Sequence, residues 1–194
     1  MLKNKGKWLL ICLVMMFSVS IAGCTQSKSN QKKVNVSETQ IIKPIFDAPS
    51  YSRISKSDLF SRLGKTSDVE KWNNKTAKET FPMTIYSYDD KDSTHYEFIV
   101  ANDTDTVVRV TMYSAKNWAG KGTDIKYTKK SMNEMLALLN ITPKDSAKVT
   151  ADTGVAYRIS PVSDKVGDVW FLELNKDDST FGMVKITYDL NYFD

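Results

Sequence analysis

The sequence predicts an α+β domain made of two tandem repeats, each a short helix plus an antiparallel three-stranded meander, with the helices on one face of the sheet. Three observations predict this. Shifting the chain against itself by 76 residues aligns similar residues at both ends of a unit, a capped helix pattern occurs twice, and alternating strands follow each helix. The repeats span residues 51–113 and 127–189, and a turn-rich segment joins them.

Residues 1–23 are typical of an export signal, because three lysines precede an apolar run from Trp8 to Ala22. These fifteen residues are fewer than the roughly 20 that a membrane-spanning helix needs. The run ends in Ile21-Ala22-Gly23-Cys24, which resembles the lipobox of bacterial lipoproteins. The resemblance implies cleavage between Gly23 and Cys24 and a diacylglyceryl group on the Cys24 sulfur. An uncleaved anchor or an ordinary signal peptide is the alternative.

Residues 24–44 are expected to form a flexible tether, because Ser, Asn, Gln and Lys dominate their composition. The net charge of +4 includes three lysines in residues 1–23 and a further +3 in residues 24–44, so residues 45–194 carry −2. The basic pI of about 8.9 therefore does not predict nucleic-acid binding. We expect residues 45–194 to be the globular domain.

Both cysteines lie outside that domain. Cys12 falls within the export signal and Cys24 is the predicted lipid anchor, so the exported fold contains no thiol. This excludes a disulfide framework, a cysteine nucleophile and a thiolate metal site.

Each repeat is predicted to begin with a short helix. In residues 55–64, Ser55 or Ser57 is the candidate N-cap, and Gly64 ends a stripe formed by Leu59, Phe60 and Leu63. In residues 131–140, Ser131 and Asn140 occupy the matching positions around Met132, Met135, Leu136 and Leu139. Both Gly and Asn tolerate the left-handed backbone that ends a helix.

Three strands should follow each helix, since polar and apolar residues alternate there. In the first repeat they are expected at residues 83–88, 96–100 and 108–113. In the second repeat they are expected at residues 155–160, 170–174 and 184–188.

The segment Ser-Lys-Ser-Asp-Leu-Phe-Ser-Arg-Leu-Gly, residues 55–64, followed by a Tyr-rich meander and repeated in tandem, resembles the β-lactamase-inhibitor-protein fold. The chain is also similar to small lipoproteins related to the outer-membrane SmpA/OmlA family and to uncharacterised lipoproteins of lactobacilli and streptococci. The resemblance implies that the protein binds partner proteins. It also favours the cell membrane of a Gram-positive over a Gram-negative bacterium, with the domain on the extracytoplasmic side.

The inventory of reactive side chains is short. His95 is the one histidine, and it is expected to be a turn residue of no chemical consequence. The acidic segments 89–93 and 175–179 lack the spacing of a calcium loop and are expected to be hairpin turns. We therefore expect no catalytic residue, no metal and no cofactor, and we expect the protein not to be an enzyme.

One polar pattern occurs in both repeats. Glu97 and Arg109 lie twelve residues apart around a turn, as do Glu173 and Lys185, which predicts opposite charges facing each other across neighbouring strands. The face opposite the helices is therefore the predicted interaction surface. Its predicted members are Glu97, Arg109, Thr111, Tyr113, Phe171, Glu173, Lys185 and Thr187. Filling of the core is the alternative role for the aromatic members.

Together these observations predict a membrane-anchored extracytoplasmic lipoprotein that acts as a non-catalytic protein-binding module with an unknown partner. The alternative is an envelope lipoprotein that binds a small ligand or a cell-wall polymer, or that has a structural role. A pocket lined by Trp72, Trp118 or Trp170 would favour the ligand. A buried carboxylate pair in a cleft would favour an enzyme.

Overall fold

The computed structural model describes residues 42–127 and 131–193. The predicted export signal, Cys24 and most of the tether lie outside the described residues, so the division at residues 24 and 45 and the lipid anchor stay predictions. Within the described ranges, every helix is too short or too polar to cross a membrane.

Strands dominate the described part of the chain, which forms one sheet of nine strands with three α-helices and two 3₁₀-helices. The strands are β1 (Asp68–Lys75), β2 (Thr80–Asp89), β3 (His95–Ala101), β4 (Thr106–Tyr113), β5 (Ile125–Lys126), β6 (Val149–Asp152), β7 (Ala156–Ile159), β8 (Asp168–Asn175) and β9 (Thr180–Thr187). The helices are η1 (Ala48–Tyr51), α1 (Lys56–Leu63), α2 (Ala115–Ala119), α3 (Met132–Ala137) and η2 (Leu190–Tyr192).

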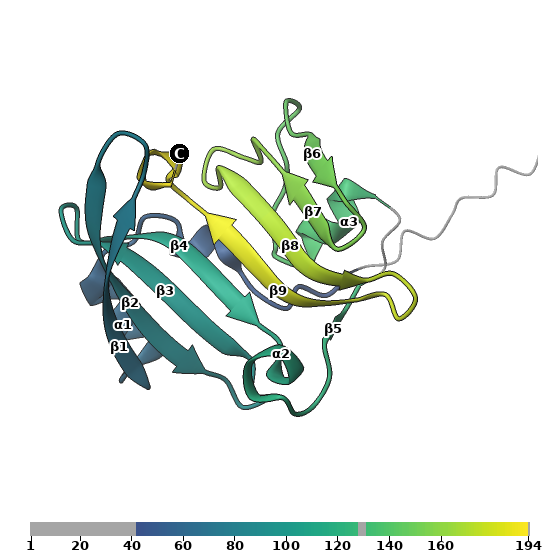
Figure 1. The fold of residues 1–194 in the computed structure, drawn as a ribbon, viewed down its shortest axis with the longest axis horizontal. Coiled ribbons are helices and arrows are strands. Elements are labelled where there is room, and N and C mark those ends of the chain that lie inside the picture. The colour runs from purple at the N-terminus through teal and green to yellow at the C-terminus, as the bar shows by residue number, and fades with distance from the viewer. Residues whose placement is uncertain (1–41, 128–130, 194) are drawn as a thin grey trace, which may run out of the picture. The chain divides into compact units, whose positions relative to one another are not determined.

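The sheet is antiparallel throughout, with the order β1-β2-β3-β4-β9-β8-β7-β6 and with β5 paired to β9. Strands β4 and β9 meet at its centre (Figure 1). Val110 of β4 lies opposite Ile186 of β9. The first and second halves of the domain therefore share one continuous sheet.

This architecture corrects the predicted fold class. The chain is not two helix-plus-three-strand repeats, because β1 and β6 add a fourth strand to each meander and β4 joins β9. Alternation did not reveal β1, whose sequence DVEKWNNK is polar, because this edge strand is largely exposed and is held by backbone pairing with β2. The helices also do not share one face: α1 and α3 pack into the main core, whereas α2 stacks on His95 and η2 packs into a second cluster on the opposite side.

The predicted helix starts are confirmed. Ser55 accepts a hydrogen bond from the Asp58 amide at 3.1 Å, and Ser131 caps α3 through the Glu134 amide at 3.3 Å. Gly64 follows α1 with a φ of 75°, and Asn140 follows α3 with a φ of 56°.

The connection between the halves was predicted to be turn-rich, and it also contains the short helix α2. Ser114 accepts a hydrogen bond from the Asn117 amide at 3.0 Å and caps α2, and Gly120 ends that helix in the left-handed conformation. Five residues of α2 bury nothing completely, so the sequence carries no apolar stripe that would have revealed the helix.

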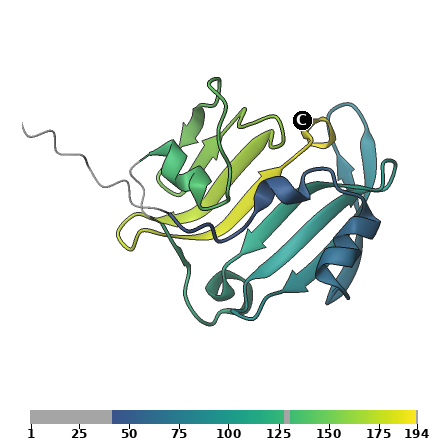
Figure 2. The same ribbon diagram turned by 180° about the vertical axis from the view of Figure 1, so that it is seen from behind.

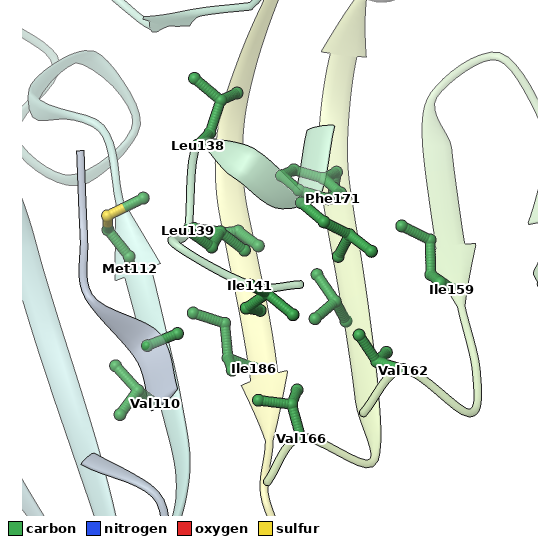
Figure 3. Close-up of a cluster of buried hydrophobic side chains, with 14 of the residues drawn as sticks. Val110, Met112, Leu138, Leu139, Ile141, Ile159, Val162, Val166, Phe171 and Ile186 are labelled. Carbon is green, nitrogen blue, oxygen red and sulfur yellow. The ribbon is translucent and has the colours of Figure 1, made fainter. Parts of the chain in front are cut away.

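The main core lies on one side of the sheet, which we call the core face. Its central cross-strand row consists of Phe98, Val110, Ile186, Val169 and Ile159. Leu59 of α1 and Met135 and Leu136 of α3 pack into the same cluster. Figure 2 shows η1 and α3 in front of this face, and Figure 3 shows the packed side chains. Burial of this row is the main source of stability.

A second, smaller cluster lies on the other side and joins η2 to the sheet. Tyr192 of η2 packs there against Met83, Ile99, Ala101 and Val108. Val108 reaches this side through a β-bulge, because Ile99 lies opposite Arg109 and Val100 lies opposite Val107. The bulge therefore places Val108 and Arg109 on the same side of β4.

Candidate functional site

Between α2 and η2 none of the described helices covers the second side of the sheet, and we call this strip the open face (Figure 1). Its centre is the cross-strand row Glu97, Thr111, Lys185 and Trp170. Residues directly opposite each other in antiparallel strands share a face, so these four side chains lie side by side. The open face is therefore an array of charged, polar and aromatic groups across four neighbouring strands.

Tyr113 and Glu97 form a hydrogen-bonded pair on this face. The Tyr113 hydroxyl donates to Glu97 Oε2 at 3.0 Å. Burial, with a further contribution from the Glu97 charge, raises the pKa of Tyr113, so the phenol keeps its proton. The pair presents one fixed phenol and one carboxylate.

Two cations lie half-buried beside that pair. Arg109 donates from Nε to Thr187 Oγ1 at 3.0 Å, and its guanidinium carbon lies 3.4 Å from the centre of the Phe193 ring. Burial lowers the pKa of Lys185, Arg109 lowers it further, and Glu97 opposes the change. The fold thus holds Lys185 in a position that disfavours its charge.

Sequence reasoning missed a third group, on β7 and β8. Arg158 donates from Nε to Asp168 Oδ2 at 2.8 Å, a second guanidinium nitrogen contacts the same oxygen, and its carbon lies 4.9 Å from the Trp170 ring centre. Asp168 is 2% exposed, and its Oδ1 has no hydrogen-bond partner among the described residues. In the sequence, Asp168 appears only as an acidic residue at the start of an apolar strand. An acidic residue in an exposed loop would look the same, so the sequence did not reveal the ion pair.

Most of the predicted interaction surface lies on this side. Glu97, Arg109, Tyr113 and Lys185 are half-buried there. Thr111 and Thr187 share the same cross-strand rows but are buried, and Glu173 is exposed near α2, where Asn117 Nδ2 donates to its carboxylate.

Phe171 is the wrong member of the predicted set, because it is fully buried in the core face. Leu174, three residues further along β8, lies in the same cluster, although an odd spacing normally places two side chains on opposite faces. Glu173 between them has a φ of 54°, and its Cβ would lie 3.2 Å from a Cβ added at Gly182 on the opposing strand. In both strands the alternation of side chains between the two faces is interrupted here. Counting every second residue therefore assigns the wrong face.

The predicted charge pairs are also wrong in register. Glu97 lies opposite Thr111, whereas Arg109 lies opposite Ile99. Lys185 lies opposite Trp170 rather than Glu173. The turns set these registers: β3 and β4 close on the pair Ala101–Thr106, and β8 and β9 close on the pair Asn175–Thr180, so residues twelve positions apart are not directly opposite.

His95 has a packing role that its position at a strand start did not reveal. It is 3% exposed, its Nδ1 lies 2.8 Å from Asp89 Oδ1, and its ring stacks on Trp118 of α2 with 3.6 Å between ring centres. This stack places α2 on the side opposite α1. Nothing among residues 42–127 and 131–193 brings three or more His, Cys, Asp or Glu residues together as a metal site.

The open face offers an indole, a phenol, the Glu97 carboxylate and three cations, and the buried Asp168 carboxylate pairs with one of these cations, Arg158. Such an array suits non-covalent recognition, because ordered aromatic and arginine side chains dominate binding energy in protein interfaces.

No family model matches the chain, and no curated protein matches it. Among solved structures, it is similar to a cysteine-rich secretory protein from Staphylococcus aureus, with 12% identity and a TM-score of 0.42. The match covers 76% of this chain and 48% of that protein, so this chain spans about half of its length.

Proposed function

We propose that the protein is a membrane-anchored extracytoplasmic lipoprotein and acts as a non-catalytic protein-binding module through its open face. The observation that carries the binding proposal is the placement of Lys185. Its ammonium is half-buried beside Arg109 on the strip that the helices of residues 42–127 and 131–193 leave uncovered. A charge that is partly removed from water lowers the stability of the fold. Proteins keep such destabilising residues mainly at functional sites.

The anchor rests on Cys24 at the end of the apolar segment. Metabolic labelling with a fatty-acid analogue tests it directly. The unaltered protein should carry the label and sediment with membranes, and Cys24→Ser should lose both. Label retained by Cys24→Ser would remove the anchor from the proposal.

Binding is tested by crosslinking the tagged lipoprotein in membranes and identifying captured proteins by mass spectrometry. The combination Tyr113→Ala with Lys185→Ala should abolish capture of the specific partner, because it deletes a ring and a charge from the open face. The combination Val69→Ala with Val155→Ala is the matched control, since both valines are exposed elsewhere. Equal capture by both double variants, with similar melting temperatures, would exclude the open face.

A further inference from the structure

A cavity of about 260 Å³ opens on the core-face side of the domain, next to the β2–β3 hairpin. Its wall is mainly aromatic, and the rings come from the segment before α1 and from two neighbouring strands: Phe46, Tyr51, Tyr88, Tyr96 and Phe98. The volume lies below the usual range for drug-sized ligands, so the cavity suits a small group.

The rings hold one another in place. Phe46 stacks on Tyr51 with centres 5.2 Å apart and also lies 5.5 Å from Tyr96. Phe98 contacts Tyr51 at 5.1 Å and Tyr88 at 5.7 Å, the latter edge to face. These mutual contacts fix the wall before any ligand arrives, which reduces the entropy lost on binding.

Two carboxylates, Asp89 and Asp90, complete the lining. Asp90 Oδ1 accepts the Asp92 and Thr94 amides at 2.8 and 2.9 Å, and its Oδ2 accepts the Tyr96 hydroxyl at 3.2 Å. Within the described ranges these neutral donors are the only partners shown for Asp90, whereas Asp89 contacts His95. The Asp90 charge is therefore oriented but not neutralised.

Two cations of the chain lie nearby. The Arg62 guanidinium carbon is 5.7 Å from the Tyr51 ring centre, and its Nη1 donates to the Ser50 carbonyl at 2.7 Å. Lys43 lines a neighbouring cavity that shares Asp90 and Tyr96. Neither residue lines the aromatic cavity itself.

The wall also contains a polar group without a partner. Tyr88 is 7% exposed, and its hydroxyl has no hydrogen-bond partner among the described residues. A buried hydroxyl is normally satisfied, so this atom is available to a polar substituent of a ligand.

We propose that this cavity binds a small quaternary ammonium group, with the rings contacting its methyl groups and Asp90 supplying the opposite charge. Aromatic faces attract cations, most strongly where water is excluded, and a quaternary ammonium cannot be recognised by donated hydrogen bonds. This site is separate from the open face and does not depend on the proposed protein partner.

The test is a calorimetric or NMR titration of the full-length protein and its variants with choline chloride. The matched ligand 3,3-dimethylbutan-1-ol has the same shape without the charge. Choline should bind at least about fivefold more tightly than the neutral alcohol. Equal affinities, or no binding of choline, would overturn the proposal.

Variants then locate the site. Asp90→Asn should weaken choline about fivefold and leave the neutral alcohol unchanged. Phe46→Leu keeps an apolar wall but removes a ring, so it should reduce the preference for choline over the alcohol. Asp177→Asn, in the exposed β8–β9 turn, is the charge-matched control. A loss of affinity in Asp177→Asn equal to that in Asp90→Asn would show non-specific attraction and refute the site.

The ammonium group could belong to a free solute or to a lipid headgroup, and the two are separated by a second titration. Vesicles of phosphatidylcholine and phosphatidylglycerol are compared with vesicles of phosphatidylglycerol alone. Choline-reversible binding that requires phosphatidylcholine would assign the headgroup, whereas binding of free choline without it would assign the solute.

Discussion

The two faces of the sheet are stabilised by different interactions. The core face is a continuous apolar surface in which Phe98, Val110 and Ile186 lie in one row under η1 and α3. The corresponding row of the open face contains Glu97, Thr111 and Lys185, and a hydrogen bond from the Tyr113 hydroxyl fixes Glu97. Burial is non-directional, whereas the contacts of the open face depend on geometry.

Under the proposed function, this difference separates stability from recognition. Substitutions on the core face should change the free energy of unfolding in proportion to the buried area they remove. Substitutions on the open face should have smaller effects on unfolding and larger effects on binding, except where they uncover a buried charge. The following predictions test this division.

The largest effect is expected for Ile186→Ala at the centre of the core face. Ile186 is fully buried and lies between β4 and β8, where the surrounding strands cannot collapse into the cavity. The variant should lose about 4 kcal/mol of unfolding free energy, measured by urea denaturation. Val69→Ala, on the exposed edge strand, should change it by less than about 0.5 kcal/mol. A loss below about 1 kcal/mol for Ile186→Ala would contradict the assignment of the main core.

The exception to the division is Arg158→Leu, which leaves the Asp168 carboxylate buried without its cation. We expect a loss of about 3 kcal/mol in urea unfolding, because one partner of a buried pair is removed. Arg158→Leu combined with Asp168→Leu should recover much of that loss. If the double variant is no more stable than the single one, the penalty does not come from the uncompensated carboxylate.

A smaller loss is expected for Trp118→Ala, which removes the indole stacked on His95. Trp118 is 50% exposed, so the change should cost about 1 kcal/mol of unfolding free energy. Hydrogen exchange should show faster exchange in α2 and unchanged exchange in β8. Unaltered α2 protection would mean that the stack does not hold this helix.

The opposite sign is expected for Lys185→Met, which removes the disfavoured charge. The variant should gain about 0.5 kcal/mol at neutral pH. The pKa of Lys185 is lowered in the folded state, so between that value and 10.5 the unfolded chain binds more protons and wild-type stability rises with pH. The advantage of Lys185→Met should therefore shrink as pH is raised through this window. A constant advantage up to pH 10.5 would contradict the assigned cause.

Sequence reasoning succeeded where the signal was local. The Ser55 and Ser131 side chains cap amides three residues away, and Gly64 and Asn140 have positive φ values shortly after α1 and α3, so both helix starts and stops were predictable. The edge strand β1 and the short helix α2 were missed because neither buries a repeating apolar stripe.

The phase of β8 was missed for a different reason. The change of face near Glu173 depends on Gly182 of the neighbouring strand, and Trp170 and Phe171 are both large aromatic residues. No single-strand pattern distinguishes which of the two enters the core. The open face was therefore predicted in outline, while Trp170, Arg158 and Asp168 emerged only from the pairing of β7 with β8.

The pairing of β4 with β9 has a consequence for the order of assembly. Sixty-six residues lie between the end of β4 at Tyr113 and the start of β9 at Thr180. A ribosome must therefore complete nearly the whole domain before β4 gains its second neighbour. Until then the nascent chain exposes a strand edge rich in valine, and non-local pairing of this kind slows folding. Chaperone holding before the last strand emerges would protect this edge.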